Sequence, residues 1–167
     1  MKVPILLQKS ASDLLRLYKA RDTTPTEVLQ TIFAWADRVE PTVNAFVTQY
    51  REEALALAAQ SDKRYAEGKR TRPLEGIPIS VKDDTPIRDR VSTMGSLIYR
   101  DTRGSSTNPS VERLINAGAI IHARTACPEF CWAWFTDSRI NGVTRNPWNP
   151  EITPGGSSGG SAAALAA

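Results

Sequence analysis

Lys82 is the first residue of the sequence whose position could serve catalysis. It follows the apolar run Ile77–Val81, which predicts a buried strand, so its side chain would be drawn into a dry interior. Desolvation disfavours the charged ammonium, and a lysine that has lost its proton is a competent general base. The alternative is a charged lysine whose amine reaches water and pairs with Asp83 or Asp84.

A second candidate is the run GGSSGG at residues 155–160. It lacks the Gly-Lys-Ser/Thr of a phosphate-binding P-loop, and its spacing differs from that of a dinucleotide-binding loop. A flexible linker and an anion-binding loop are alternatives. The alanine-rich segment 161–167 that follows should form a helix, and a glycine loop that opens a helix is a recurrent way to aim a serine.

The remaining reactive side chains do not predict a metal or cofactor site. Cys127 and Cys131 are the two cysteines, and His122 is the single histidine, which is too few ligands for a zinc site. We therefore expect reduced thiols in a cytoplasmic protein, with no metal and no cofactor. His122 lies in an apolar stretch and is interpreted as a core residue.

Composition predicts one globular domain. The 167 residues are 41% apolar and 23% charged, and the formal net charge is +3. This charge is too small to indicate direct binding to nucleic acid, and the basic run KRTR at residues 69–72 is interpreted as a solvated loop. The apolar run at residues 3–7 is too short for a signal peptide or a membrane anchor, so we expect no membrane partner.

Helices and strands in a fixed order must position these residues. Helical patterns cover residues 10–20, 24–40 and 50–67, with a Thr-x-x-Glu capping box at Thr24 and a stop before Pro41. A strand ending near Lys82, a helix at 108–117 that Asn108 caps, and a second apolar strand at 119–124 follow. This order predicts an α/β fold with parallel strands.

Three segments in this order resemble the amidase signature family. They are GIPISVKD at 76–83, AGAIIHARTACPEF at 117–130 and GVTRNPWNPEITPGGSSGGSAAALAA at 142–167. The resemblance implies a mixed sheet covered by helices. Residues 1–167 would then be the N-terminal part of a single domain, with a helical layer over about 1–68 and an α/β part over about 69–167.

The resemblance also implies roles for individual residues. Lys82 matches the base of a Ser–Ser–Lys triad, and Ser157 matches the bridging serine, which follows a cis peptide bond at Gly156–Ser157. The nucleophilic serine would lie beyond residue 167, so we expect residues 1–167 alone to release no ammonia from simple amides. Cys131, Trp132 and Trp134 match a segment that lines the substrate pocket; the alternative is that they pack in a core. Trp148 is expected to fill a structural position.

The implied activity is hydrolysis of a small-molecule carboxamide by acyl transfer. One alternative is a subunit of a glutamine-dependent tRNA amidotransferase, which would need partner chains. Another is a truncated, non-enzymatic binding module. A partial sheet would leave an exposed edge, so self-association of the isolated chain is also expected.

Overall fold

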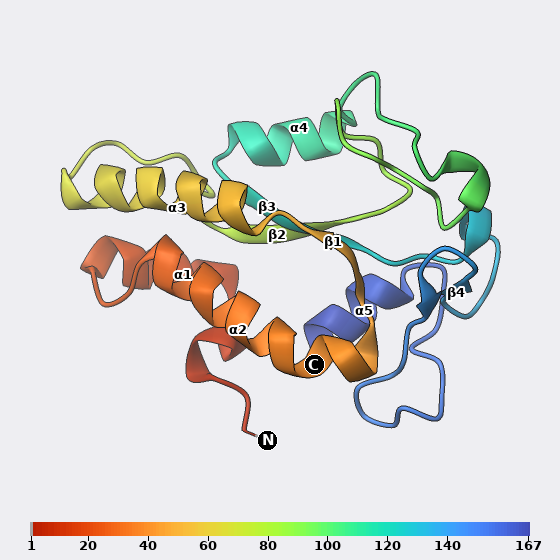
Figure 1. Ribbon diagram of the computed structural model, residues 1–167. Helices are drawn as coiled ribbons and strands as arrows, with labels where there is room; N and C mark the ends of the chain where they lie inside the picture. Colours follow the sequence, from red (N-terminus) through yellow and green to blue (C-terminus); the bar gives the residue numbers. More distant parts are fainter. Residues whose placement is uncertain (1) are drawn as a thin grey trace. The chain divides into compact units, whose positions relative to one another are not determined.

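The computed structural model describes residues 2–167, and Figure 1 shows the order of the elements. The α-helices are α1 (Ala11–Ala20), α2 (Pro25–Val43), α3 (Arg51–Ala66), α4 (Pro109–Asn116) and α5 (Gly159–Ala166). The strands are β1 (Phe46–Gln49), β2 (Pro78–Lys82), β3 (Ile120–Thr125), β4 (Asp137–Ser138) and β5 (Gly142–Val143). Short 3₁₀ helices are η1 (Ile5–Gln8), η2 (Leu97–Tyr99) and η3 (Glu129–Cys131).

The chain divides into two compact units. The first contains the residues up to Arg38, Tyr50–Ile79 and Arg113–His122. The second contains Val39–Gln49, Ser80–Glu112 and Ala123–Ala167. Both Lys82 and Ser157 belong to the second unit, so the candidate site can be described within it.

Side-chain caps mark the start of α2 and of α4. The backbone N–H of Glu27 donates to Thr24 Oγ1 at 3.1 Å, and the Thr24 N–H donates to Glu27 Oε2 at 3.1 Å. This reciprocal pair is the predicted capping box, and it satisfies N–H groups that a helix start leaves free. Asn108 caps α4 as predicted, because its Oδ1 accepts the N–H of Ser110 at 2.9 Å.

Helix α2 continues through Pro41, so the predicted stop before this proline is wrong. Proline lacks the backbone N–H that would donate to the carbonyl four residues earlier, and α2 nevertheless runs two residues past it. The helix ends instead at Val43, and the next residue, Asn44, has a left-handed backbone with φ of 52°. The Glu40 carboxylate accepts the next two N–H groups, from Ala45 at 3.1 Å and Phe46 at 2.9 Å.

The core of the first unit lies among α1, α2 and α3. One buried cluster joins α2 to α3 through large side chains on α2 and small ones on α3, where alanines allow close approach. Its members are Leu29, Phe33, Ala54, Ala58 and Ile120. A second cluster joins α1 to α2 and contains Leu14, Tyr18, Val28 and Ile77.

The sheet has the order β1-β3-β2 and mixes strand directions. Strand β1 is antiparallel to β3, with Phe46 opposite Thr125 and an irregularity before Thr48. Backbone bonds join Ile120 to Ile77 at 2.8 Å and Asp83 to Thr125 at 3.0 Å. The residue numbers of the bonded partners increase together along the two strands, so β2 and β3 run parallel. The predicted α/β class and the parallel pair are confirmed.

A buried ion pair fixes the end of β2 within the second unit. Asp83 and Arg124 are each 1% exposed, and Arg124 Nε lies 3.3 Å from Asp83 Oδ1. Arg124 also donates to the Thr85 carbonyl at 2.8 Å and to Ser92 Oγ at 3.0 Å, while Asp83 accepts the Thr93 N–H at 3.0 Å. Since these bonds satisfy both buried charges, they hold the residue next to Lys82 in place.

A buried carboxylate in the first unit makes stability depend on pH. Glu75 is fully buried and accepts hydrogen bonds from Arg72 Nε at 2.8 Å and Ser61 Oγ at 2.6 Å. Burial raises the pKa of Glu75, but the hydrogen bonds from Arg72 and Ser61 outweigh burial and bring the pKa to about 2.

Glu75 should therefore stabilise the fold at neutral pH and lose that effect in acid. Its folded pKa lies below the ordinary 4.5, so the contribution, about 3 kcal/mol, is complete above pH 4.5 and disappears as the pH falls toward 2. Urea unfolding of the unmodified protein and of Glu75→Gln at several pH values measures the contribution of Glu75 to the free energy of unfolding. The difference in unfolding free energy should shrink in acid. A difference that stays constant from pH 7 to pH 2.5 would contradict this assignment.

Candidate active site

The structure places Lys82 and Ser157 in direct contact. Lys82 is the last residue of β2, and Ser157 lies 75 residues later in the loop before α5. Lys82 Nζ donates to Ser157 Oγ at 2.9 Å, and only 16% of the Lys82 side chain is exposed. A half-buried amine on a serine hydroxyl is an arrangement that can move a proton once the lysine is neutral.

Thr136 holds the two ends of the glycine–serine loop together. Its hydroxyl donates to the Gly155 carbonyl at 2.9 Å and accepts the Gly159 N–H at 3.1 Å. The peptide bond between Gly156 and Ser157 is cis, as the resemblance implies. Thr136 is 1% exposed, so these two hydrogen bonds to the loop are shielded from water. The sequence carries no pattern that marks this residue.

Replacing Thr136 by valine should destabilise the loop. Valine keeps the shape but leaves the buried Gly159 N–H and the Gly155 carbonyl without a partner, which should cost about 1–3 kcal/mol of unfolding free energy. Thr136→Ser keeps the hydroxyl and serves as the matched control. Chemical unfolding of both variants gives the comparison. Equal stabilities of the valine and serine variants would show that the hydroxyl does not hold the loop.

The start of α5 is tied to the end of β3. Thr125 Oγ1 and Ser161 Oγ are 2.7 Å apart, and the Gly160 N–H donates to the Ala126 carbonyl at 3.2 Å. A Cβ on Gly160 would lie 2.4 Å from the Ala126 nitrogen, so only glycine permits this approach. Ser161 is thus engaged with Thr125, and Ser157 is the serine of this segment that Lys82 contacts.

Asp84 completes a polar cluster around Lys82. Its Oδ2 lies 3.3 Å from Lys82 Nζ and accepts a hydrogen bond from Cys131 Sγ at 3.3 Å. Burial lowers the pKa of Lys82, but the charge of Asp84 and the Cys131 thiol outweigh burial, so the pKa of Lys82 lies above its ordinary value. Lys82 therefore pairs with Asp84, as the alternative interpretation has it, although only 16% of its side chain is exposed. Its action as a neutral base stays a prediction.

The three residues expected to line the substrate pocket divide into two groups. Cys131 joins the Lys82 cluster through Asp84. Trp132 and Trp134 are 89% and 90% exposed, so they do not pack in a core formed by residues 2–167. Trp148 is 85% exposed, so it fills no position within residues 2–167, and its expected structural role stays a prediction. A role of Trp132 and Trp134 toward substrate stays a prediction.

The other titratable groups singled out in the sequence, His122 and Cys127, are both buried. Burial lowers the pKa of His122 to about 4, so the imidazole is neutral at pH 7, and its ring contacts Phe33 edge-on. Cys127 is buried, and burial raises the pKa of its thiol. Residues 2–167 contain no group of three or more His, Cys, Asp or Glu side chains that could hold a metal ion. None of their helices is long and apolar enough to span a membrane.

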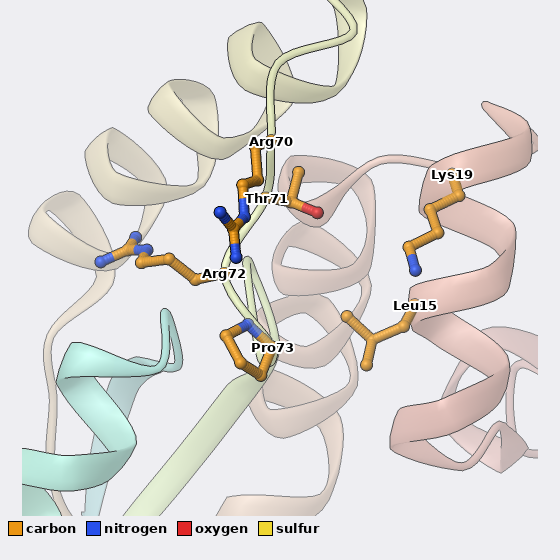
Figure 2. Close-up of a pocket in the computed structure, with 6 residues that line it drawn as sticks. All are labelled: Leu15, Lys19, Arg70, Thr71, Arg72 and Pro73. Atoms are coloured by element: carbon orange, nitrogen blue, oxygen red, sulfur yellow. The ribbon is translucent and has the colours of Figure 1, made fainter.

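A pocket in the first unit contains neither Lys82 nor Ser157. Figure 2 shows Leu15 and Lys19 of α1 on one side of it and the loop segment 70–73 on the other. Arg72 of this loop is already bonded to Glu75. The run KRTR expected to be a solvated loop contributes to this pocket, and Lys69, Arg70 and Arg72 are exposed.

Comparison with known proteins decides the family. The amidase family model matches residues 27–167. The chain belongs to the amidase signature family. It is 41% identical, over 97% of its length, to a glutamyl-tRNA(Gln) amidotransferase subunit of Lachnospira eligens, and 40% identical, over 83% of its length, to an indoleacetamide hydrolase of Bradyrhizobium diazoefficiens. It spans 34% of the first relative and 27% of the second, so it corresponds to about a third of these proteins.

Solved structures of this family confirm the fold. The crystal structure of a bacterial aryl acylamidase of the amidase signature family matches with a TM-score of 0.87 at 30% identity. The match covers 93% of this chain and 32% of the acylamidase. The predicted amidase-signature fold, with a mixed sheet and helices, is therefore confirmed for this chain.

Proposed function

We propose that the protein containing this chain hydrolyses carboxamides by acyl transfer, with Lys82 and Ser157 as its proton-transfer pair. The observation that carries the proposal is the hydrogen bond of 2.9 Å between Lys82 Nζ and Ser157 Oγ. Membership of the amidase signature family supports it. The nucleophile in this proposal is a third serine outside residues 1–167.

The proposed reaction begins with the loss of a proton from Lys82. In the structure Lys82 is the donor to Ser157, so the lysine must be neutral before it can accept. The nucleophilic serine then attacks the amide carbonyl, its proton passes to Ser157, and the Ser157 proton passes to Lys82. Returning the proton to the leaving nitrogen breaks the C–N bond and releases ammonia or an amine. Water hydrolyses the acyl-enzyme to the carboxylic acid, and the serine hydroxyl is restored.

A second candidate is the glutaminase step of a tRNA-dependent amidotransferase. The 41% identity to one subunit of a glutamyl-tRNA(Gln) amidotransferase, over nearly the whole chain, favours it. The chemistry at Lys82 and Ser157 would be the same, with glutamine as the amide. The difference would lie in the partner chains and in the use of the ammonia that is released.

The two candidates are separated by assaying the whole protein with glutamine and with a panel of aliphatic and aryl carboxamides. We expect ammonia or amine release from members of the panel without partner chains, and an acyl-enzyme visible by mass spectrometry after rapid acid quenching. Turnover of glutamine alone, and only when partner chains are added, would favour the amidotransferase. The absence of any amide turnover or acyl-enzyme would contradict the proposal.

A further inference from the structure

We infer that Asp84 is a positioning residue that holds the Lys82 amine on Ser157 and sets the pH range in which this amine can accept a proton. The inference deepens the proposed function and rests on it for its catalytic meaning. Its physical content is the coupling of the Asp84 carboxylate to Lys82, which can be tested without any turnover.

The geometry gives the Lys82 amine two fixed acceptors. Ser157 Oγ lies 2.9 Å away and Asp84 Oδ2 lies 3.3 Å away. The carboxylate is held in turn, because Cys131 Sγ donates to its Oδ2 at 3.3 Å and Thr85 Oγ1 donates to its Oδ1 at 3.0 Å. An amine with two fixed acceptors has fewer free rotamers, so the carboxylate keeps Nζ close to the serine hydroxyl.

The electrostatic coupling should be strong because both side chains are shielded from water. Lys82 is 16% exposed and Asp84 is 28% exposed, so solvent screens the pair less than it would a surface ion pair. The groups facing Lys82 are the Asp84 carboxylate from its own segment, the Cys131 thiol from η3 and the Ser157 hydroxyl from the loop before α5. The neighbouring Asp83 carboxylate is directed to Arg124 instead.

The pKa shifts of Asp84, Lys82 and Cys131 all favour the same protonation state of the cluster. Burial raises the pKa of Asp84, but hydrogen bonds from Cys131 and Thr85 and the charge of Lys82 outweigh it, so the net direction is downward. The pKa of Lys82 is raised despite burial, chiefly by Asp84. Burial and Asp84 together raise the pKa of the Cys131 thiol. The resting cluster is therefore an ammonium, a carboxylate and a thiol.

Asp84 thus has opposite effects on the positioning of the Lys82 amine and on its ability to accept a proton. It keeps the amine in position, and it stabilises the protonated lysine that cannot act as a base. Removing its charge while keeping its shape should shift the ascending, acid limb of the pH–rate profile to lower pH. A residue with only a structural role would lower the rate at every pH by the same factor and leave the position of this limb unchanged.

The first test measures Lys82 directly in the whole protein. Lysine labelled with ¹³C at Cε is followed by NMR as the pH rises, and Lys82→Met identifies the resonance. In Asp84→Asn the midpoint for Lys82 should move to lower pH. The matched control is Asp101→Asn, which removes an exposed carboxylate paired with Arg100 and should leave the midpoint in place. An unchanged midpoint in Asp84→Asn would overturn the inference.

The second test uses Cys131 as a reporter. The rate of iodoacetamide labelling at Cys131, read by peptide mass spectrometry, should begin to rise at lower pH in Asp84→Asn than in the unmodified protein. Equal labelling profiles would contradict the coupling of Asp84 to this cluster.

These readouts separate the inference from the proposed function. If amides are hydrolysed and Lys82→Met is inactive, but the acid limb of Asp84→Asn stays in place, the proposed function stands and the inference fails. If no amide is hydrolysed, the proposed function fails, and the NMR and labelling profiles still decide whether Asp84 controls the protonation of Lys82.

Discussion

Replacing Lys82 by methionine in the whole protein should reduce kcat/KM for amide hydrolysis by about 10⁴-fold or more, as the loss of a proton-transfer residue does in other acyl-transfer enzymes. This corresponds to about 5 kcal/mol of transition-state stabilisation. The physical reason is that Lys82 Nζ contacts Ser157 Oγ at 2.9 Å, and methionine can neither accept nor donate a proton there. Steady-state kinetics over a range of pH values measures the loss.

Two further variants separate the role of the base from the role of the charge. Lys82→Arg keeps a positive charge and hydrogen-bond donors, but a guanidinium does not lose its proton in proteins, so this variant should be about as inactive as Lys82→Met. Lys69→Met is the matched control, because Lys69 is an exposed lysine that pairs with Glu67. It should retain full activity. Substantial activity in Lys82→Arg would show that the charge is sufficient and that Lys82 is not the base.

The second large effect should come from the buried ion pair beside the site. Arg124→Met leaves the Asp83 carboxylate, which is 1% exposed, without its cation. Removing one partner of a buried pair costs about 3–5 kcal/mol, which is a large part of the stability of an ordinary domain. Because the Asp83 N–H also bonds to the Thr125 carbonyl at 3.0 Å, the loss should reach the end of β2 and lower activity.

A double-mutant cycle tests whether the unpaired charge of Asp83 causes the loss of stability in Arg124→Met. In Asp83→Asn combined with Arg124→Met no unpaired charge remains buried, so the double variant should unfold less easily than Arg124→Met alone. Arg100→Met, which breaks an exposed pair with Asp101, should have little or no effect. Urea unfolding followed by circular dichroism gives these free energies. A stability of Arg124→Met close to that of the unmodified protein would contradict the account of this pair.

Local sequence signals predict several features of the backbone. The capping box at Thr24 and the Asn108 cap are patterns of a few residues, and both form as predicted. The apolar run before Lys82 correctly places this residue at a strand end, although β2 is only partly buried, with Ser80 exposed and Val81 buried. The predicted stop at Pro41 is wrong, since α2 continues to Val43.

The contacts within the site depend on long-range geometry and could be predicted only in part. The family resemblance pairs Lys82 with Ser157, although 75 residues separate them. Burial alone favours a neutral Lys82, whereas the Asp84 carboxylate beside it raises the pKa of the lysine, and the pattern Lys-Asp-Asp that permits this pairing is visible in the sequence. Cys131 reaches this carboxylate through left-handed backbone at Phe130 and Cys131, with φ of 52° and 58°, which no sequence pattern indicates.

The burial of the tryptophan side chains could not be predicted from the local sequence. An aromatic side chain in a loop favours burial on average, but whether a core lies beneath that loop depends on the tertiary structure. Trp148 is 85% exposed, which the local turn at Asn146 and Pro147 could not indicate.

The central claim is that Lys82 and Ser157 act as one proton relay, and a double-mutant cycle on amide hydrolysis tests it most directly. Residues of one relay depend on each other, so Lys82→Met combined with Ser157→Ala should lose about as much kcat/KM as the more damaging single variant. If the two losses multiply instead, the residues act independently, and the contact of 2.9 Å between them is not the path of the proton.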